Sequence, residues 1–104
     1  MILSVQQAKF ELLAYIKEFD TTFSNWCVGL SANPKQTLFD ERHVRDEQDP
    51  WLYKQLLSHR AAGIVRSYFV EQLRVIAAPN PTAPDLEDVD CVYLYKVAQH
   101  TKQE

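Results

Sequence analysis

Glycine and long apolar runs are scarce in this chain. Only Gly29 and Gly63 occur among 104 residues, and a loop that cradles phosphate needs glycines so that several backbone N–H groups can approach the ligand. A phosphate-binding loop is therefore disfavoured. No stretch approaches the apolar length that spans a bilayer, and the N-terminal MILSVQQAKFELL lacks the charge and cleavage site of a signal peptide. We predict a cytoplasmic protein without a membrane segment.

Positive charge is also in deficit. The chain carries 11 Lys and Arg against 14 Asp and Glu, which gives a formal net charge of −3 and a pI of about 5.6. Proteins that neutralise a phosphate backbone usually show clustered basic residues. Tight autonomous binding to nucleic acid is therefore disfavoured, although four cations could still build a basic patch: Lys54, Arg60, Arg66 and Arg74.

Metal-ligand clusters and nucleophile signatures are missing as well. Cys27 and Cys91 both lie in apolar, strand-like stretches, where we expect small buried hydrophobes in a reducing compartment. The three histidines are isolated, and the acidic residues 85–90 lack the glycine and spacing of an EF-hand loop. We predict no catalytic residues, no metal site and no cofactor.

The hydrophobic content is that of an ordinary globular protein. Apolar residues make up 46% of the chain and aromatics 12%, which excludes general disorder. A chain of 104 residues is long enough for one hydrophobic core but not for two. We predict a single domain over residues 1–104, with its core at about 4–97, an acidic Pro-rich loop at 78–90 and a frayed tail at 98–104.

Three helix starts can be located from capping residues. Ser4 with Gln7 forms a capping box, Asn33 precedes a proline at the first helical position, and Ser58 is a good N-cap. Apolar residues recur at helical spacing after each start, and Phe10 lies off the first apolar stripe. The predicted helices cover residues 5–19, 34 to 42 or 43, and 59–77.

Three apolar, aromatic-rich runs are typical of strands, at 26–30, 51–57 and 91–97. We therefore predict an α+β fold in the order α-β-α-β-α-β, with a small sheet of three antiparallel strands packed against helices. Gly29 in its strand predicts a bulge, close packing of a helix, or the close approach of another backbone or of a ligand. Gly63 predicts close packing of the third helix on the sheet. Because a second copy of the chain could cover an exposed edge of so small a sheet, a homodimer is a possible assembly.

The segments WCVGLSANPKQTLFDERHV, WLYKQLLS, VRSYFVE and VYLYK resemble a family of small uncharacterised bacterial and phage-borne α/β domains. Its members carry a YVGI strand, an RLF helix, a WIYR strand and a closing VYxY strand. The resemblance implies a prophage-associated accessory protein. The same order of elements is similar to a permuted core of GIY-YIG nucleases, in which a tyrosine and an arginine act on the phosphate and a glutamate holds the metal.

This chain departs from the nuclease pattern at three positions. The family arginine falls on Thr37, the histidine on Arg42 and the glutamate on Arg66. Without a metal-holding carboxylate, phosphoryl transfer loses its charge neutralisation. We therefore expect a non-enzymatic accessory or protein-interaction domain with an unknown protein partner.

The alternative function is a nucleic-acid-binding or degenerate GIY-YIG-like nuclease domain. It would use a groove beside the glycine of the first predicted strand, in which basic and aromatic side chains converge. The groove residues predicted are Trp26, Gly29, Lys35, Arg42, Arg66, Tyr93 and Tyr95.

Overall fold

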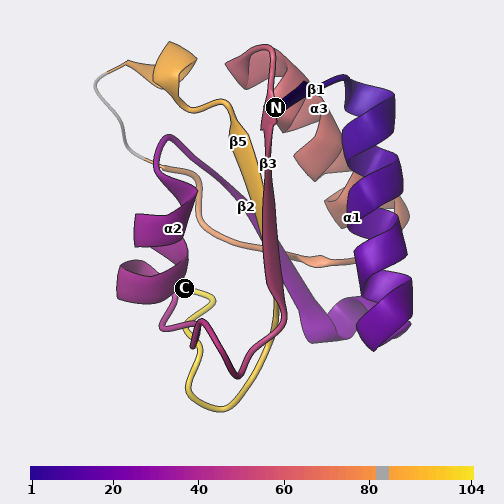
Figure 1. Ribbon diagram of the computed structural model, residues 1–104, viewed down its shortest axis with the longest axis vertical. Coiled ribbons are helices and arrows are strands. Elements are labelled where there is room, and N and C mark those ends of the chain that lie inside the picture. Colours follow the sequence, from indigo (N-terminus) through magenta and orange to yellow (C-terminus); the bar gives the residue numbers. More distant parts are fainter. Residues whose placement is uncertain (82–84) are drawn as a thin grey trace.

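A mixed five-stranded sheet in the order β1-β3-β5-β2-β4 runs through the computed structural model, which describes residues 1–81 and 85–104. Helices α1 (Val5–Phe19) and α3 (His59–Ser67) lie on one side of the sheet, and α2 (Pro34–Gln36) lies on the other (Figure 1). The strands are β1 (Ile2–Leu3), β2 (Trp26–Ser31), β3 (Trp51–Leu56), β4 (Ile76–Ala77) and β5 (Cys91–Lys96).

The α+β class is confirmed, but the prediction of a three-stranded antiparallel sheet is wrong. The three long strands do pair antiparallel, with β5 between β2 and β3. Two further strands extend the sheet in parallel pairing, β1 beside β3 and β4 beside β2. Each added strand has only two residues, which is too short to show the alternation that identifies a strand in a sequence.

The third helix is shorter than predicted. It continues from α3 through a π-helical turn, Tyr68–Gln72, and ends before Arg74, whose φ of 65° is left-handed. The N–H of Val75 then donates to the carbonyl of Phe69 (3.0 Å), and the chain enters β4 instead of remaining helical to residue 77. Gly63 does not pack closely either, because no atom lies within 4 Å of a Cβ built there.

The first helix is confirmed with both of its boundaries. The Ser4 side chain accepts a hydrogen bond from the N–H of Gln7, and the Gln7 side chain accepts one from the N–H of Ser4. This reciprocal capping satisfies two N–H groups that the first turn leaves without partners. The apolar stripe that follows buries three side chains completely against the sheet: Ala8, Leu12 and Ile16.

Alternation along the long strands divides the sheet into two faces. We call the face covered by α1 and α3 the helical face; its strand residues are Trp26, Val28, Leu30, Leu52, Leu56, Val92 and Leu94. We call the opposite face the tyrosine face; its strand residues include Cys27, Gly29, Ser31, Trp51, Tyr53, Tyr93 and Tyr95. A π-helical turn, Thr37–Glu41, continues α2 over the tyrosine face and buries Leu38 there.

The C-terminal residues 98–104 are hydrogen-bonded to the tyrosine face, in contrast to the frayed tail that we expected. The N–H of Lys102 donates to the carbonyl of Arg42 (2.8 Å), and the Tyr95 hydroxyl donates to the carbonyl of Lys102 (3.0 Å). Thr101 is buried, and its hydroxyl donates to the carbonyl of Ala98 (2.8 Å). The tail thus closes one end of this face beside α2 (Figure 1).

Candidate functional site

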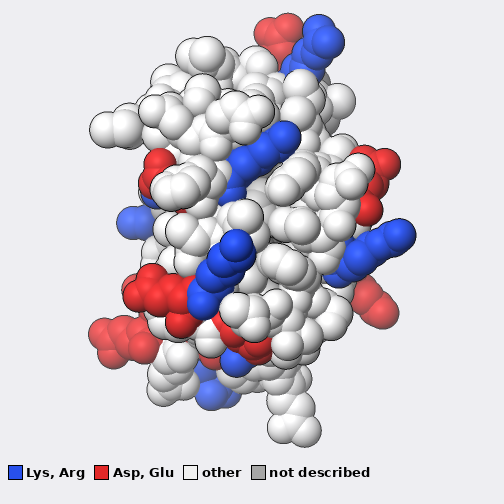
Figure 2. Space-filling model, turned by 90° about the vertical axis from the view of Figure 1, so that its right-hand side faces the viewer, with Lys and Arg blue, Asp and Glu red and all other residues white. Residues whose placement is uncertain are grey.

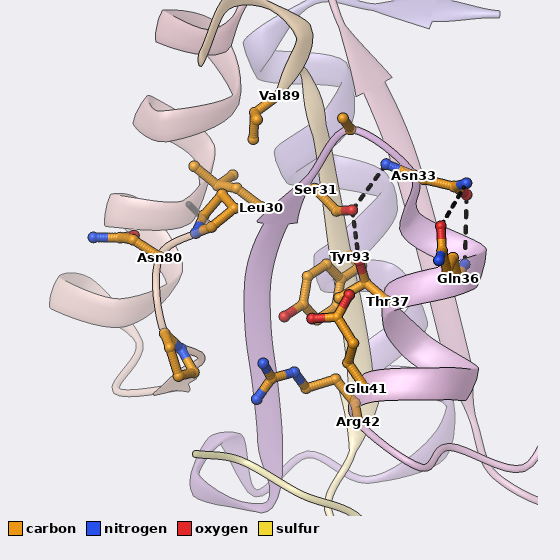
Figure 3. A pocket seen from close by; sticks show the side chains of 13 residues that line it. Leu30, Ser31, Asn33, Gln36, Thr37, Glu41, Arg42, Asn80, Val89 and Tyr93 are labelled. Carbon is orange, nitrogen blue, oxygen red and sulfur yellow. Dashed lines mark hydrogen bonds between the residues drawn. The ribbon is translucent and has the colours of Figure 1, made fainter. Parts of the chain in front are cut away.

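A pocket of about 440 Å³ lies on the tyrosine face. Its walls are the end of β2, the π-helical turn Thr37–Glu41 and the segment 79–81, and Tyr93 of β5 lies between them (Figure 3). Strand β2, the π-helical turn and Tyr93 of β5 position its lining before any ligand arrives. We take it as the candidate site.

Tyr93 is held in the pocket by its cross-strand neighbour Gly29. A Cβ built at Gly29 would come within 3.0 Å of Cζ, Oη and Cε2 of Tyr93, closer than real Cβ atoms approach. The tyrosine ring therefore lies across the glycine, and only a residue without a side chain leaves room for it. The close approach predicted at Gly29 is thus made by a side chain of the protein itself.

Arg42 is a buried charge that contacts the C-terminal tail. Only 9% of the residue is exposed. Nη1 donates to the backbone oxygens of Lys102 (3.4 Å) and of Glu104 (3.1 Å), the last residue of the sequence, while Nε has no partner among the described residues. Guanidinium groups are seldom this buried unless they are paired. Arg42 therefore holds the tail against the wall of the pocket.

Arg66 brings a second guanidinium close to the same face. Its Nη2 donates to the carbonyl of Ala78 (2.9 Å), and its buried Nε has no described partner. It lines a smaller cavity of about 280 Å³ that shares Leu30, Asn80 and Pro81 with the pocket of Tyr93. Arg66 is thus a neighbour of the candidate site and holds the chain that forms its wall.

Burial keeps the phenol and thiol groups of this face protonated. It raises the pKa of Tyr93 to about 12, against the weaker opposing effect of Arg42, and also raises the pKa values of Cys27 and Tyr95. The Tyr93 hydroxyl makes no hydrogen bond to a described residue. At neutral pH it is therefore a free donor at the pocket, and Cys27 is a neutral thiol without nucleophilic character.

Most other polar groups of the pocket are already paired with each other. The hydroxyls of Ser31 and Thr37 are 2.7 Å apart, and Ser31 Oγ also accepts from the N–H of Asn33 (2.9 Å). The exposed Glu41 places a carboxylate at the rim without forming a described ion pair (Figure 3). Among the buried groups of the pocket, those without a described partner are Nε of Arg42 and the Tyr93 hydroxyl.

The structure divides the seven residues of the predicted groove. Arg42 and Tyr93 line the pocket, Gly29 lies beneath Tyr93, and Arg66 lines the adjoining cavity.

The other three lie elsewhere. Trp26 is fully buried on the helical face, where its indole N–H donates to the carbonyl of Asp20 (2.8 Å). Tyr95 is buried against the C-terminal tail, and Lys35 is exposed on α2 outside the pocket.

Sequence reasoning missed Glu41, Ser31 and Asn80 as pocket residues. The position of Glu41, directly before Arg42 on a short helix, was a signal that could have placed it at the same wall. Asn80 gave no such signal, because its position depends on the unforeseen strand β4.

Comparisons of the chain with protein-family models, curated proteins and solved structures found no match. Among the described residues, no group of three His, Cys, Asp or Glu side chains could hold a metal ion. None of the helices within residues 1–81 and 85–104 is both long and apolar enough to cross a membrane. The class defined by fold and site is therefore an α+β domain with a preformed, donor-rich pocket.

Proposed function

We propose that this protein is a non-enzymatic accessory domain of the cytoplasm that binds a partner protein through the pocket on its tyrosine face. The observation that carries the proposal is the preformed pocket, in which the Tyr93 hydroxyl has no hydrogen-bond partner among the described residues and lies on the same wall as the buried guanidinium of Arg42. A donor of this kind is stabilised when a ligand brings an acceptor.

The chemistry of the pocket suits binding more than bond breaking. A nucleophile or general base needs a pKa near the working pH, but burial moves Tyr93 and Cys27 away from it. The Tyr93 ring also lies across Gly29 and is buried there. A neutral donor beside a guanidinium is an arrangement for recognition of an acceptor group.

The charge distribution supports a protein partner over nucleic acid. Figure 2 shows that acidic and basic side chains are interspersed, with uncharged surface between them, over the α1 face, which lies on the other side of the sheet from the pocket. The pocket itself has Glu41 at its rim, which would repel a phosphate backbone. A continuous basic stripe is what tracking of a nucleic acid strand needs.

A pull-down of the tagged protein from its native cell extract, with and without nuclease digestion, tests the proposal. We expect a stoichiometric protein partner that survives digestion. Its capture should fall with Tyr93→Phe and Arg42→Gln, and should persist with Phe10→Ala, which changes a 74% exposed aromatic on α1 away from the pocket.

Loss of the partner on digestion would contradict the proposal. Dependence on Phe10 with indifference to the pocket variants would contradict it as well. Thermal unfolding followed by circular dichroism verifies that each variant is folded at the temperature of the assay.

A further inference from the structure

We infer that the groove between α1 and residues 51–54 of β3 binds an extended peptide segment of a partner protein, which adds to the sheet as a short antiparallel strand and carries a basic side chain. The inference goes beyond the proposed function, because it concerns a second surface. The groove and the pocket of Tyr93 share no lining residue, so the failure of one leaves the other standing.

The first step is the edge of the sheet that β3 leaves open. β1 is the outermost strand on this side, and it pairs with only two residues of β3, Gln55 and Leu56. No described strand lies beside the preceding residues 51–54 there. At roughly 3.3 Å per residue these positions span about 10 Å, so about three residues of an added strand fit beside them.

The second step is which backbone groups face that edge. In an antiparallel pair, hydrogen-bonded residues alternate with residues whose backbone groups point away from the partner strand. The N–H of Leu56 donates to the carbonyl of Asp90, directly before β5 (2.9 Å), so the even-numbered residues of β3 pair with β5. Trp51 and Tyr53 therefore turn their backbone groups outward. The N–H of Trp51 lies near the hydroxyl of Tyr15, which leaves the carbonyl of Trp51 and both backbone groups of Tyr53 for an added strand.

The third step is the groove itself, which lies along this edge. α1 runs alongside β3 on the helical face (Figure 1), and a hollow of about 250 Å³ is lined by both elements. Its walls include Phe10, Ala14 and Glu18 of α1, and Leu52 and Lys54 of β3. A second hollow of about 440 Å³ continues the groove toward β1. An added strand would thus pair with β3 at its edge and place alternate side chains in the hollow beside α1.

The fourth step is the charge of the groove. A lysine on an edge strand commonly discourages pairing, but Lys54 Nζ is engaged with Glu11 Oε1 of α1 (3.0 Å), and the two charges balance. Glu18 forms no ion pair with a described residue. The remaining charge of the groove is therefore negative. A lysine or arginine of the occupant complements it, with the apolar stem on Phe10 and Leu52 and the cation at Glu18.

The test is an NMR titration of the full chain with the peptide acetyl-Thr-Val-Lys-Val-Thr-amide. In the antiparallel register the first valine lies opposite Tyr53, and the lysine lies opposite Leu52 and faces α1. We expect saturable binding at about millimolar affinity for so short a peptide, with a downfield shift of the Tyr53 amide proton. Before the peptide is added, this amide should exchange with solvent much faster than the amides of Leu52 and Lys54, which pair with β5.

Two modified peptides test the backbone contacts. N-methylation of the first valine removes the N–H that donates to the carbonyl of Tyr53, and it should abolish saturable binding. N-methylation of the lysine alters an N–H that points away from β3, and it should be tolerated.

Two protein variants test the charge. Glu18→Gln should weaken binding about two- to fivefold, the value of an exposed ion pair, and should not change the binding of a peptide with norleucine in place of the lysine. Glu71→Gln removes an exposed carboxylate outside the groove and should change nothing.

Equal weakening by the two N-methyl groups would overturn the inference, because it would show that no backbone pairing is made at this edge. Slow exchange of the Tyr53 amide in the free protein would overturn it too, since the edge would then be closed. Equal weakening by Glu71→Gln and Glu18→Gln would contradict the groove, because it would indicate attraction to net charge alone.

Discussion

The two faces of the sheet are built from the same three long strands but have different chemistry. On the helical face, aliphatic side chains such as Val28 and Leu94 are completely buried beneath α1 and α3. On the tyrosine face, the alternate positions carry phenols and a thiol; Cys27, Tyr93 and Tyr95 are also buried, whereas Trp51 and Tyr53 are partly exposed. A sheet that completes its hydrophobic core on one face can thus hold polar groups and a pocket on the other.

This difference indicates that the helical face stabilises the fold, whereas the tyrosine face binds a ligand. Stability comes mainly from apolar area removed from water, which the helical face supplies. The tyrosine face contains Arg42 and Tyr93, which line the pocket; Nε of Arg42 and the Tyr93 hydroxyl have no hydrogen-bond partner among the described residues. Substitutions on the two faces should therefore separate stability from binding.

The largest effect on stability is expected from Phe69→Ala. Phe69 is fully buried in the core cluster of the helical face, and truncation of such a residue leaves a cavity. We expect a loss of roughly 3–5 kcal/mol in the free energy of unfolding, measured by urea denaturation. A loss below about 1 kcal/mol would show that the helical face does not carry the stability.

The next effect is expected at Gly29. In Gly29→Ala the new Cβ would overlap Tyr93, so the ring must leave its place, and we expect a destabilisation of about 1–3 kcal/mol. Gly63→Ala is the matched control: no atom lies within 4 Å of its Cβ, and alanine in α3 should stabilise by about 0.5–1 kcal/mol. The two changes in stability should have opposite signs; a neutral Gly29→Ala would refute the close contact.

A smaller effect is expected from Tyr95→Phe. The variant removes the hydroxyl that donates to the carbonyl of Lys102 (3.0 Å) and contacts Gln103 Oε1 (3.1 Å). We expect a loss of about 1 kcal/mol and faster hydrogen exchange of the Lys102 amide, which is bonded to Arg42. Unchanged exchange at that amide would mean that the tail does not depend on the tyrosine face.

The smallest effect on stability is expected at low pH, through Asp20. Hydrogen bonds from the Asn25 side chain and the Thr22 N–H, together with Lys96, lower the pKa of Asp20 from 3.8 to about 2. The folded state thus binds this proton more weakly than the unfolded state, so the stabilisation is present above pH 4 and is lost as the pH falls toward 2. Urea midpoints measured across this range should fall less steeply in Asp20→Asn than in the parent. Parallel curves for the two proteins would contradict the role of Asp20.

Much of the fold could be predicted because its signals are local. The capping box of Ser4 and Gln7 and the Asn33-Pro34 pair located two helix starts, and aromatic-rich runs located the three long strands. The edge strands could not be found in this way, because two residues show no periodicity. The early end of the third helix could not be predicted either. A glycine usually marks such an end, but here the left-handed residue is Arg74.

The candidate site was predicted in part. Arg42 and Tyr93 were named as groove residues, and both line the pocket. Trp26 could have been excluded from the sequence alone, because it is three residues from Gly29 and successive strand residues point to opposite faces. The contacts of Tyr95 with the tail could not be foreseen, because they join polar residues that show no apolar pattern.

The most direct test of the division between the faces is to measure unfolding free energy and affinity for the captured partner on the same two variants, Tyr93→Phe and Ile16→Val. We predict that Tyr93→Phe, whose hydroxyl has no described partner, retains its stability and loses about tenfold in affinity. Ile16→Val, in the buried core of the helical face, should lose about 1 kcal/mol of stability and retain full affinity. Equal losses of both quantities in both variants would contradict the account.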